Sequence, residues 1–303
     1  EGVDVLVVLG SRLSEWATRS FSPAFSAAAT VAQVDLSPTV FGRLVPVHLP
    51  ILGDVGSVIR GLYVEAGRPG AVDTRRASSR YEAGKAAVAC NDELEGSSAD
   101  GPLKPQQLCI KLGAALRGNM DLYIDMGNCT AWATSHLRIQ PPTRIFYPCG
   151  ISTMGWSCGA VVGGKLGRPE RVAVALTGDG SFLMNGNEVR TAARYGIGTV
   201  TVVLNDDYLG MVNHGEHVQQ PHYGLNDRYF SLGGPDLESF ATSLGAQAYQ
   251  VDQPDQFAQA FAEAVTRADA DRRPQVIVAH IDPYETPPYG ERFAAIASHG
   301  GKT

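Results

Sequence analysis

Two aspartates, each placed shortly after an apolar run, have the clearest potential for chemistry in this chain. Asp179 lies in a Gly-Asp-Gly-Ser turn that follows the apolar residues 171–176. Asp206 follows 27 positions later, after the apolar residues 200–204. Carboxylate oxygens are preferred ligands of a hard cation such as Mg²⁺, which usually keeps water or phosphate oxygens as well. The pattern therefore predicts a metal site that faces a phosphate group.

The residues beside these aspartates suit the binding of an anion. Gly178 and Gly180 permit a tight turn and let the backbone approach a phosphate closely. The amides of Gly180 and Ser181 are expected to begin a helix, where N–H groups and the helix dipole favour anions. The backbone carbonyl of Tyr208 is a candidate third metal ligand. The candidate metal ligands are Asp179, Asp206 and Tyr208.

Parallel strands are the elements that would bring the two turns together. Residues 171–176 and 200–204 are short apolar runs, which are typical of buried strands. Neighbouring parallel strands present their C-terminal loops at one edge of a sheet, where doubly wound folds bind ligands. Residues 275–281 are expected to form the last strand. The predicted fold class is therefore α/β, a three-layer α/β/α parallel sheet.

The two turns together resemble the thiamine diphosphate (ThDP) motif, in which Gly-Asp-Gly precedes Asn-Asn at a similar spacing. Here Asn205 is followed by Asp206, which keeps an oxygen donor. Residues 179–188 and 205–212 resemble the acetolactate synthase and 2-oxo-acid decarboxylase branch of the ThDP-dependent enzymes. A lone Gly-Asp-Gly is more often an ordinary turn, but here the strands, the spacing and the flanks agree. The resemblance implies ThDP and Mg²⁺ as cofactors, held by a ThDP diphosphate-binding fold.

Residues 150–156 resemble a further segment of that family, Gly-Gly-Leu-Gly-Thr-Met-Gly. By this match Met154 lies beneath the thiazolium ring and forces the bent conformation of the cofactor. The backbones of Ser152 and Met154 would face the aminopyrimidine, and Ser152 stands where the family commonly has Gly. The alternative is that Met154 fills a gap in the core, as methionines often do.

Residues 122–133 are expected to form a strand, a glycine turn and the start of a helix. In the resembling family this turn meets the diphosphate from the other side. The alternative for Asn128 and Cys129 is a plain helix N-cap. The complete set of candidate cofactor-binding residues is Gly127, Asn128, Cys129, Ser152, Met154, Gly178, Asp179, Gly180, Ser181, Asp206, Tyr208, Gly210 and Met211.

Residues 213–217 follow the expected metal loop, and in the resembling family this stretch lines the mouth of the site. His214 and Glu216 are candidates for moving protons on a 2-oxo acid, since histidine titrates near neutral pH. The alternative is an exposed polar helix face, which is favoured for Glu216. Residues 219–232 are expected to form a lid that excludes water. The candidate catalytic residues are Met154, His214 and Glu216.

The composition fits a soluble α/β protein of about two domains, with 303 residues, 44% hydrophobic and 18% charged. The net charge of −6, without a basic stretch interleaved with aromatic residues, argues against nucleic acid as a partner. No run reaches the ~18 apolar residues of a membrane span. The five cysteines have no Cys-x-x-Cys spacing, which favours reduced thiols and a cytoplasmic location.

Three segments are expected along the chain. Residues 1–65 resemble the second half of the family's central domain, a Rossmann-like module that binds FAD or ADP in some members. FAD is compatible with this module but is not predicted. Residues 66–104 turn polar and small, which is typical of a linker. Residues 105–303 are expected to form the diphosphate-binding domain with a C-terminal tail.

The resembling enzymes also carry a pyrimidine-binding domain whose glutamate activates the cofactor. This chain shows no such domain, so a second polypeptide is expected to supply it in a hetero-oligomer, a dimer of heterodimers. A fragment of a longer chain is the alternative.

The implied activity is decarboxylation of a 2-oxo acid followed by carbon–carbon bond formation. Simple decarboxylation and a non-catalytic scaffold or regulatory subunit are the alternatives. A dinucleotide-dependent oxidoreductase is disfavoured, because no Gly-x-Gly-x-x-Gly turn follows a strand with an acidic residue at the usual distance.

Overall fold

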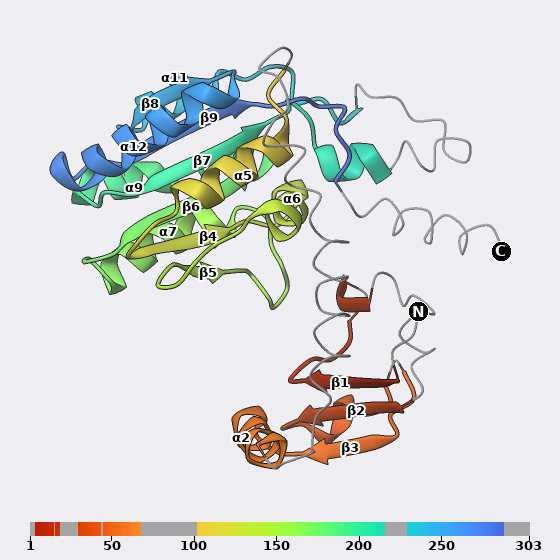
Figure 1. Cartoon of the computed structure of the whole chain (residues 1–303). Coiled ribbons are helices and arrows are strands. Elements are labelled where there is room, and N and C mark those ends of the chain that lie inside the picture. The colour runs from red at the N-terminus through yellow and green to blue at the C-terminus, as the bar shows by residue number, and fades with distance from the viewer. Residues whose placement is uncertain are drawn as a thin grey trace. The chain divides into compact units, whose positions relative to one another are not determined.

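Two parallel β-sheets organise the part of the chain that the computed structural model describes, residues 4–14, 16–18, 30–43, 45–67, 102–215 and 229–287 (Figure 1). The first sheet has three strands and the second has six, and each belongs to its own structural unit. No helix within these ranges is long and apolar enough to cross a membrane.

The first unit contains β1 (Val5–Leu9), β2 (Thr30–Asp35) and β3 (Leu49–Leu52), paired in parallel in that order. The two short 3-10 turns η1 (Trp16–Thr18) and η2 (Pro38–Val40) lie between these strands in the sequence.

The helix α2 (Val55–Ala66) follows β3. Asp54 caps it, because its carboxylate accepts a hydrogen bond from the Ser57 amide at 2.8 Å. No residue of α2 is buried within this unit.

The second unit is built on six parallel strands in the order β5-β4-β6-β7-β9-β8. Their bounds are β4 (Met120–Ile124), β5 (Arg144–Phe146), β6 (Val172–Gly178), β7 (Val200–Asn205), β8 (Gln247–Val251) and β9 (Gln275–His280). The chain runs from β4 outward to β5 and then returns to the opposite side of β4 to form β6. The connection therefore changes direction between β4 and β6, which is where such sheets bind ligands.

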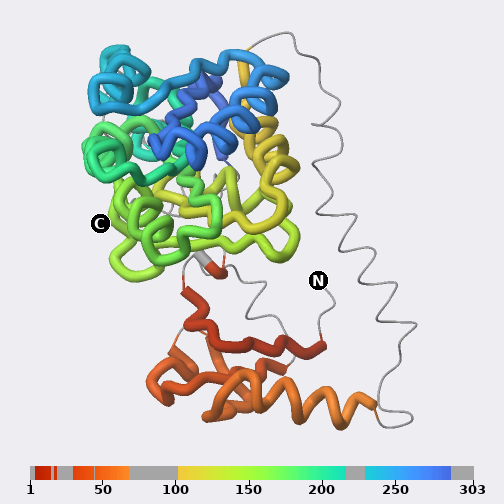
Figure 2. Tube along the Cα trace, turned by 90° about the vertical axis from the view of Figure 1, so that its left-hand side faces the viewer, coloured from red at the N-terminus to blue at the C-terminus, as the bar shows by residue number. Residues whose placement is uncertain are grey.

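Helices cover both faces of this sheet. Packed against one face are α5 (Pro105–Ala115), α6 (Asn128–His136) and α12 (Pro254–Ala270). Packed against the other are α7 (Trp156–Gly167), α8 (Asp179–Asn185), α9 (Glu188–Tyr195) and α11 (Leu237–Ser243). Figure 2 shows the yellow α5 beside the blue α12. The predicted three-layer α/β/α fold is confirmed.

Successive side chains along each strand point to opposite faces of the sheet, so one strand contributes to the core on both faces. In β6, Val174 and Leu176 pack into the layer with α5, α6 and α12, whereas Ala173 and Ala175 pack against α7 and α9. Both sets of side chains are almost fully buried. A strand buried on both faces must be apolar throughout, which explains the continuous apolar runs in the sequence.

A buried ion-pair network holds the N-terminal ends of β4 and β6 together. Asp121 has a buried side chain, and its two oxygens accept hydrogen bonds from Arg168 and Arg171, each at 2.6 Å. Arg171 also donates to the carbonyls of Met120 and Pro142. The buried carboxylate is thus fully compensated, as a buried charge must be.

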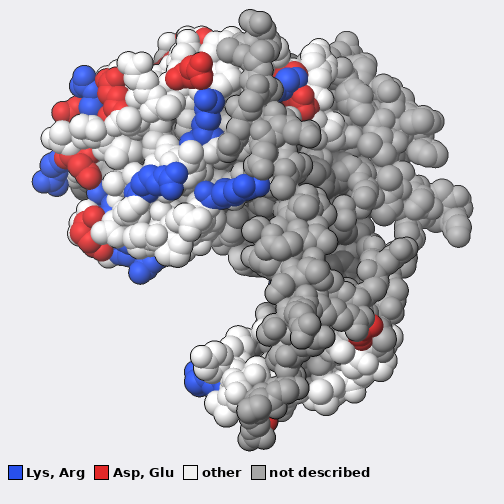
Figure 3. All heavy atoms as spheres, in the orientation of Figure 1, with Lys and Arg blue, Asp and Glu red and all other residues white. Residues whose placement is uncertain are grey.

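Several sequence-based expectations lie wholly or largely outside the described residues. They include most of the linker at 66–104, Glu216, and most of the lid at 219–232. The domain boundaries stay predictions. On the face of the molecule in Figure 3, the described Lys and Arg side chains lie interspersed with Asp and Glu.

Candidate functional site

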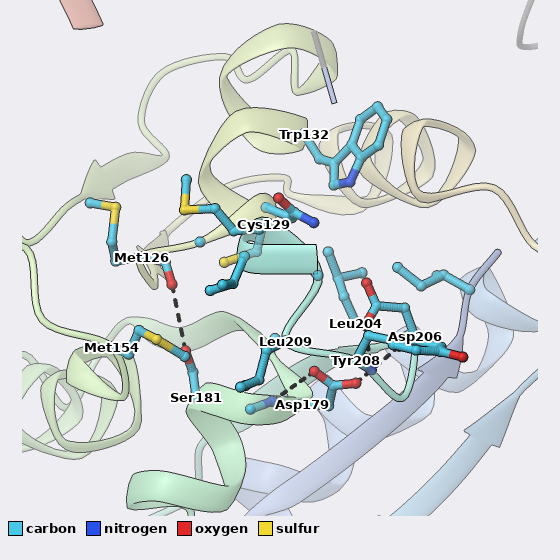
Figure 4. A pocket seen from close by; sticks show the side chains of 18 of the residues that line it. Met126, Cys129, Trp132, Met154, Asp179, Ser181, Leu204, Asp206, Tyr208 and Leu209 are labelled. Atoms are coloured by element: carbon cyan, nitrogen blue, oxygen red, sulfur yellow. Dashed lines mark hydrogen bonds between the residues drawn. The ribbon is translucent and has the colours of Figure 1, made fainter. Parts of the chain in front are cut away.

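The turns that follow β4, β6 and β7 meet around one cavity of about 180 Å³ (Figure 4). These are adjacent strands, and β6 pairs with β7 so that Gly178 lies opposite Leu204. The cavity is lined by Met126, Gly127, Asn128, Cys129, Trp132, Met154, Gly178, Asp179, Gly180, Ser181, Met184, Leu204, Asp206, Tyr208, Leu209, Gly210, Met211, Val212 and Ile281. Most of the predicted cofactor-binding residues are therefore brought together, although their roles remain predictions.

Asp179 connects the turns that follow β6 and β7. It is the first residue of α8, and its Oδ2 atom accepts hydrogen bonds from the amides of Asp206 at 3.1 Å and Asp207 at 2.8 Å. Its Oδ1 atom accepts from the amide of Gly180 at 2.7 Å. Gly180 thus differs from the expectation, because its N–H is occupied by the side chain of Asp179 rather than open to an anion.

The two acidic side chains lie together and share one titrating centre. Asp179 is buried and Asp206 partly buried, and Asp206 Oδ1 accepts a hydrogen bond from the Tyr208 amide at 3.0 Å. Burial, followed by the charge of Asp206, raises the pKa of Asp179 to about 8. Burial is also the main cause that raises the pKa of Asp206 to about 6. Two carboxylates this close favour a bound cation, which would stabilise both in their charged forms.

The donor set fits a hard divalent cation that shares its coordination with a ligand. No group of three or more His, Cys, Asp or Glu residues within the described part of the chain is arranged to hold a metal. Asp179 and Asp206 are the candidate carboxylate ligands, and a cation held by these two would need further oxygens from the backbone, water or a phosphate. That is the coordination typical of Mg²⁺ beside a diphosphate.

Two glycines keep space open around these carboxylates. A Cβ atom on Gly210 would lie 2.6 Å from Asp206 Oδ2 and 2.7 Å from Asn128 Nδ2. A Cβ atom on Gly180 would lie 2.9 Å from Leu209 Cδ2 and 3.6 Å from Met154 Cε. Any larger residue at either position would push cavity-lining side chains out of place.

The loop that carries Met154 is held by Asp125, a residue that the sequence analysis did not select. Asp125 is fully buried, and its carboxylate accepts hydrogen bonds from the amides of Met126 and Gly155, both at 2.8 Å, and of Ser157 at 2.7 Å. It thereby joins the end of β4 to the start of α7. Met154 lines the cavity with 37% of its surface exposed, so it is not a core-filling methionine.

Ser152 adopts the left-handed backbone conformation with φ of 62°. This region is readily accessible to glycine and disfavoured for other residues, which matches the glycine common at this place in the resembling family. The hydroxyl of Ser152 donates to the carbonyl of Pro148 at 2.9 Å. Ser152 does not line the cavity, so any contact to a cofactor stays a prediction.

The turn after β4 places Asn128 at the cavity, and His214, from the segment after β7, contacts Asn128 without lining the cavity. Gly127 is the N-cap of α6, and Asn128 is its first residue, so Asn128 is not itself the cap. Its amide nitrogen lies 3.3 Å from His214 Nδ1, and His214 Nε2 lies 3.3 Å from the carbonyl oxygen of Pro283. The carbonyl of Pro283 can only accept a hydrogen bond, so the His214 ring donates to it through Nε2. The described contacts of His214 thus orient Asn128 without placing the ring in the cavity wall.

Cys129 contributes to the cavity wall without a reactive thiol. Its side chain is buried, and Sγ donates to the carbonyl of Asp125 at 3.4 Å. Burial, aided by the charge of Asp125, raises the pKa of the thiol. A protonated thiol engaged in this way is a poor nucleophile and a poor metal ligand.

The sequence analysis missed an apolar part of the wall. These residues are Met126, Trp132, Met184, Leu204, Leu209, Val212 and Ile281. Apolar side chains in a cavity carry the same sequence signal as side chains in a core. Only their proximity to the glycine turns distinguishes them.

Comparison with known protein families decides the assignment. Residues 125–279 match the thiamine pyrophosphate enzyme C-terminal TPP binding domain. The chain belongs to the thiamine pyrophosphate enzyme family. Thiamine pyrophosphate and ThDP are the same compound, so the family resemblance found in the sequence is confirmed. Residues 1–62 match the central domain of thiamine pyrophosphate enzymes.

Several relatives of this thiamine pyrophosphate enzyme chain carry related names. It is 29% identical over 296 residues to a probable acetolactate synthase large subunit of Methanocaldococcus jannaschii, covering 94% of this chain and 47% of that protein. It is 32% identical over 252 residues to a putative acetolactate synthase large subunit of Mycobacterium tuberculosis, covering 82% and 43%. A putative thiamine pyrophosphate-containing protein of Bacillus subtilis is 28% identical over 276 residues, covering 88% and 44%. The chain thus spans about half the length of the curated relatives that it matches.

Proposed function

We propose that this chain is a component of a ThDP- and Mg²⁺-dependent enzyme that decarboxylates a 2-oxo acid and joins the product to an acceptor, as acetolactate synthases do. The observation that carries the proposal is the pair Asp179 and Asp206 at the rim of the cavity. Burial is the main cause that raises the pKa values of both carboxyls, and no basic side chain among the described residues forms an ion pair with either of them. A divalent cation with a diphosphate would supply the missing positive charge.

Different residues of the chain would contact the metal, the diphosphate and the thiazolium ring of the cofactor. Asp179 and Asp206 would hold the metal, with the carbonyl of Tyr208 as the third ligand, and Asn128 would face the diphosphate from the opposite turn. Met154 would contact the thiazolium ring and restrict the conformation of the cofactor. When bound, ThDP supplies the carbanion nucleophile and the electron sink for loss of CO₂.

The apolar wall of the cavity protects the reacting groups from water. Leu209, Val212 and Ile281 line it from the turn after β7 and from the segment after β9. Excluding water strengthens electrostatic interactions and prevents premature protonation of a carbanion. His214 acts behind this wall, where its contact to Asn128 fixes the direction of the amide.

A second polypeptide completes the enzyme by supplying the pyrimidine-binding domain and its activating glutamate, in a hetero-oligomer located in the cytoplasm. The exposed apolar side chains at the cavity support such a partner. Met184 is 57% and Val212 53% exposed, although both line the cavity. Exposed apolar surface beside a binding site is typical of a surface that another protein covers. The four described cysteines are unpaired thiols, which suits a reducing compartment.

Native mass spectrometry of the protein purified from its own cells tests the proposal. We expect co-purification with a second chain, together with added mass for ThDP and Mg²⁺, and turnover of pyruvate as the first substrate to be assayed. A chain that carries neither cofactor nor partner under these conditions would contradict the proposed function.

The variant Asp179→Ala tests the metal assignment. We expect Mg–ThDP affinity to fall by more than about 100-fold, since even groups behind metal ligands contribute about 10- to 100-fold. Asp255→Ala is the matched control, because that carboxylate is 84% exposed and its ion pair within the described part of the chain is with Lys111. Normal affinity in Asp179→Ala would remove Asp179 from the metal site.

The variant Met154→Ala tests the role of the apolar contact. It should keep the cofactor and lower the rate of turnover, because the variant loses the side chain that sets the cofactor's shape. An unchanged rate would assign Met154 to packing alone.

A further inference from the structure

The turn after β7 contains a residue in an unusual backbone conformation beside the proposed metal ligand. Asp207 has φ of 63°, and it is one of four described non-glycine residues with positive φ. Such a conformation is unfavourable for most side chains, although Asp and Asn tolerate it better than others. A residue held there must be stabilised by its surroundings, and these residues gather at functional sites.

Asp207 is held from one side by the proposed metal ligand Asp179. The Asp207 amide donates to Asp179 Oδ2 at 2.8 Å, and it lies 3.3 Å from Asn205 Oδ1. The neighbouring amide of Asp206 donates to the same Asp179 oxygen at 3.1 Å. The backbone of Asp207 therefore helps to orient the carboxylate of Asp179.

Asp207 is held from the other side by residues 230–234, a segment far from β7 in the sequence. Its side-chain Oδ1 accepts from the amide of Gly234 at 2.7 Å, and its carbonyl accepts from the amide of Leu232 at 2.8 Å. Tyr208 and Ser231 form an antiparallel bridge beside these bonds. The metal turn is thus attached to this segment through the backbone and the side chain of one residue.

Asp207 thus lies between the metal-binding turn after β7 and residues 230–234, and its contacts fix the position of the turn relative to this segment. Asp206, whose carboxylate is a proposed ligand, precedes Asp207 directly, and Tyr208, whose carbonyl is the proposed third ligand, follows it directly. The Asp207 amide also binds the carboxylate of Asp179. Fixing the backbone of Asp207 therefore restricts the positions of all three residues that supply proposed ligands.

We propose that Asp207 is a positioning residue for this site, which locks the metal-binding turn onto residues 230–234 through its side-chain acceptor and its left-handed backbone. This inference rests on the proposed function, since it concerns the same metal and diphosphate site. The role belongs to the hydrogen-bond acceptor and the backbone conformation rather than to the negative charge.

Three substitutions separate these contributions. Asp207→Asn keeps an Oδ1 acceptor and the tolerance of the left-handed region but removes the charge. Asp207→Gly keeps the backbone conformation and removes the acceptor. Asp207→Ala removes the acceptor and also makes the left-handed backbone unfavourable. If Asp207 is a positioning residue, the Asn variant should bind the metal most tightly, the Gly variant more weakly and the Ala variant most weakly.

The test uses the full 303-residue chain with an excess of ThDP and with Mn²⁺ as the metal probe, because the signal of free Mn²⁺ in electron paramagnetic resonance reports binding. Asp207→Asn should bind within about twofold of the unsubstituted chain. Asp207→Gly should bind Mn²⁺ about fivefold more weakly, because the loss of one hydrogen bond costs about 1 kcal/mol. Asp207→Ala should be weaker still. Hydrogen exchange of the peptide that contains Leu232 and Gly234 should be faster in the Gly and Ala variants only.

The outcomes distinguish failure of the inference from failure of the proposed function. Equal Mn²⁺ affinity in all three variants would overturn the positioning role. A loss in Asp207→Asn as large as in Asp207→Ala would also overturn it, because the charge would then be the cause. If the unsubstituted chain and its complex with the partner both fail to bind Mn²⁺ and ThDP, the proposed function itself fails and this inference with it.

Discussion

The carboxylate of Asp125 accepts a hydrogen bond from the amide of Gly155, 30 residues further along the chain, at 2.8 Å. The second oxygen accepts from Ser157 at 2.7 Å, so both atoms of one buried group are committed to the start of α7. Met154 immediately precedes Gly155. The position of the methionine at the cavity therefore depends on a side chain at the end of β4.

Replacing Asp125 by Ala should strongly destabilise the chain. The amides of Met126, Gly155 and Ser157 would be left buried without their acceptor, and each such loss is costly. We expect the free energy of unfolding to fall by about 3 kcal/mol or more. Urea unfolding followed by circular dichroism measures it, with the exposed Asp255→Ala as the control. Equal stabilities of the two variants would contradict the role of Asp125.

The stability of the metal-free chain should depend on pH through Asp179 and Asp206. Both pKa values lie above the ordinary value of 3.8, so folding favours the protonated carboxyls. Their stabilising contribution is full below about pH 4 and is lost as the pH rises through about 6 and about 8. Urea unfolding across that range should show a larger decline in the unsubstituted chain than in Asp179→Asn. Saturating Mg²⁺ and ThDP should reduce this decline in the free energy of unfolding. Identical pH profiles of the unsubstituted chain and Asp179→Asn would contradict the prediction.

Gly210→Ala should weaken metal and cofactor binding while leaving the fold intact. The new methyl group would meet Asp206 Oδ2 and Asn128 Nδ2, two side-chain atoms that can move aside only by leaving the site. Titration of Mn²⁺ in the presence of ThDP measures the loss. Gly163→Ala is the control, because a Cβ atom there meets nothing within 4 Å. Equal affinities of these two variants would show that the space beside Gly210 is not required.

Two substitutions at Ser152 should differ in stability although both remove the hydroxyl. Glycine accepts the left-handed conformation with φ of 62°, whereas alanine does not. We expect Ser152→Gly to be more stable than Ser152→Ala by about 1 kcal/mol. Thermal unfolding of the pair measures this difference. A more stable Ser152→Ala would mean that the loop relaxes to another conformation.

The centre of the site was predictable because its signals are local in the sequence. Asp179 and Asp206 each lie at the end of an apolar run, and parallel pairing of β6 with β7 brings such ends together. Gly178 and Gly180, on either side of Asp179, indicate a tight turn at this point of the chain. Strand periodicity and turn chemistry were therefore sufficient to locate this edge of the sheet.

The supporting contacts were not predictable, because they join residues that are distant in the sequence. Nothing near Asp125 indicates that its partners are Gly155 and Ser157. The position of the His214 ring depends on its contact with the Pro283 carbonyl. The hydrogen bond from the Gly180 amide depends on the rotamer of the Asp179 side chain. Such pairings follow from the tertiary arrangement of the strands and helices.

The two ends of β4 and β6 differ in how their acidic groups are compensated. At the N-terminal end, Asp121 is matched by two guanidinium groups. At the C-terminal end, no basic side chain among the described residues pairs with Asp179, or with Asp206 after β7. Under the proposed function, the first end is complete within the chain, whereas the second is completed by a bound cation. A lysine placed at that rim to neutralise the acids should stabilise the metal-free chain and compete with the cation for the same carboxylates. Stability without ligand and affinity for the ligand would then oppose each other at this edge of the sheet.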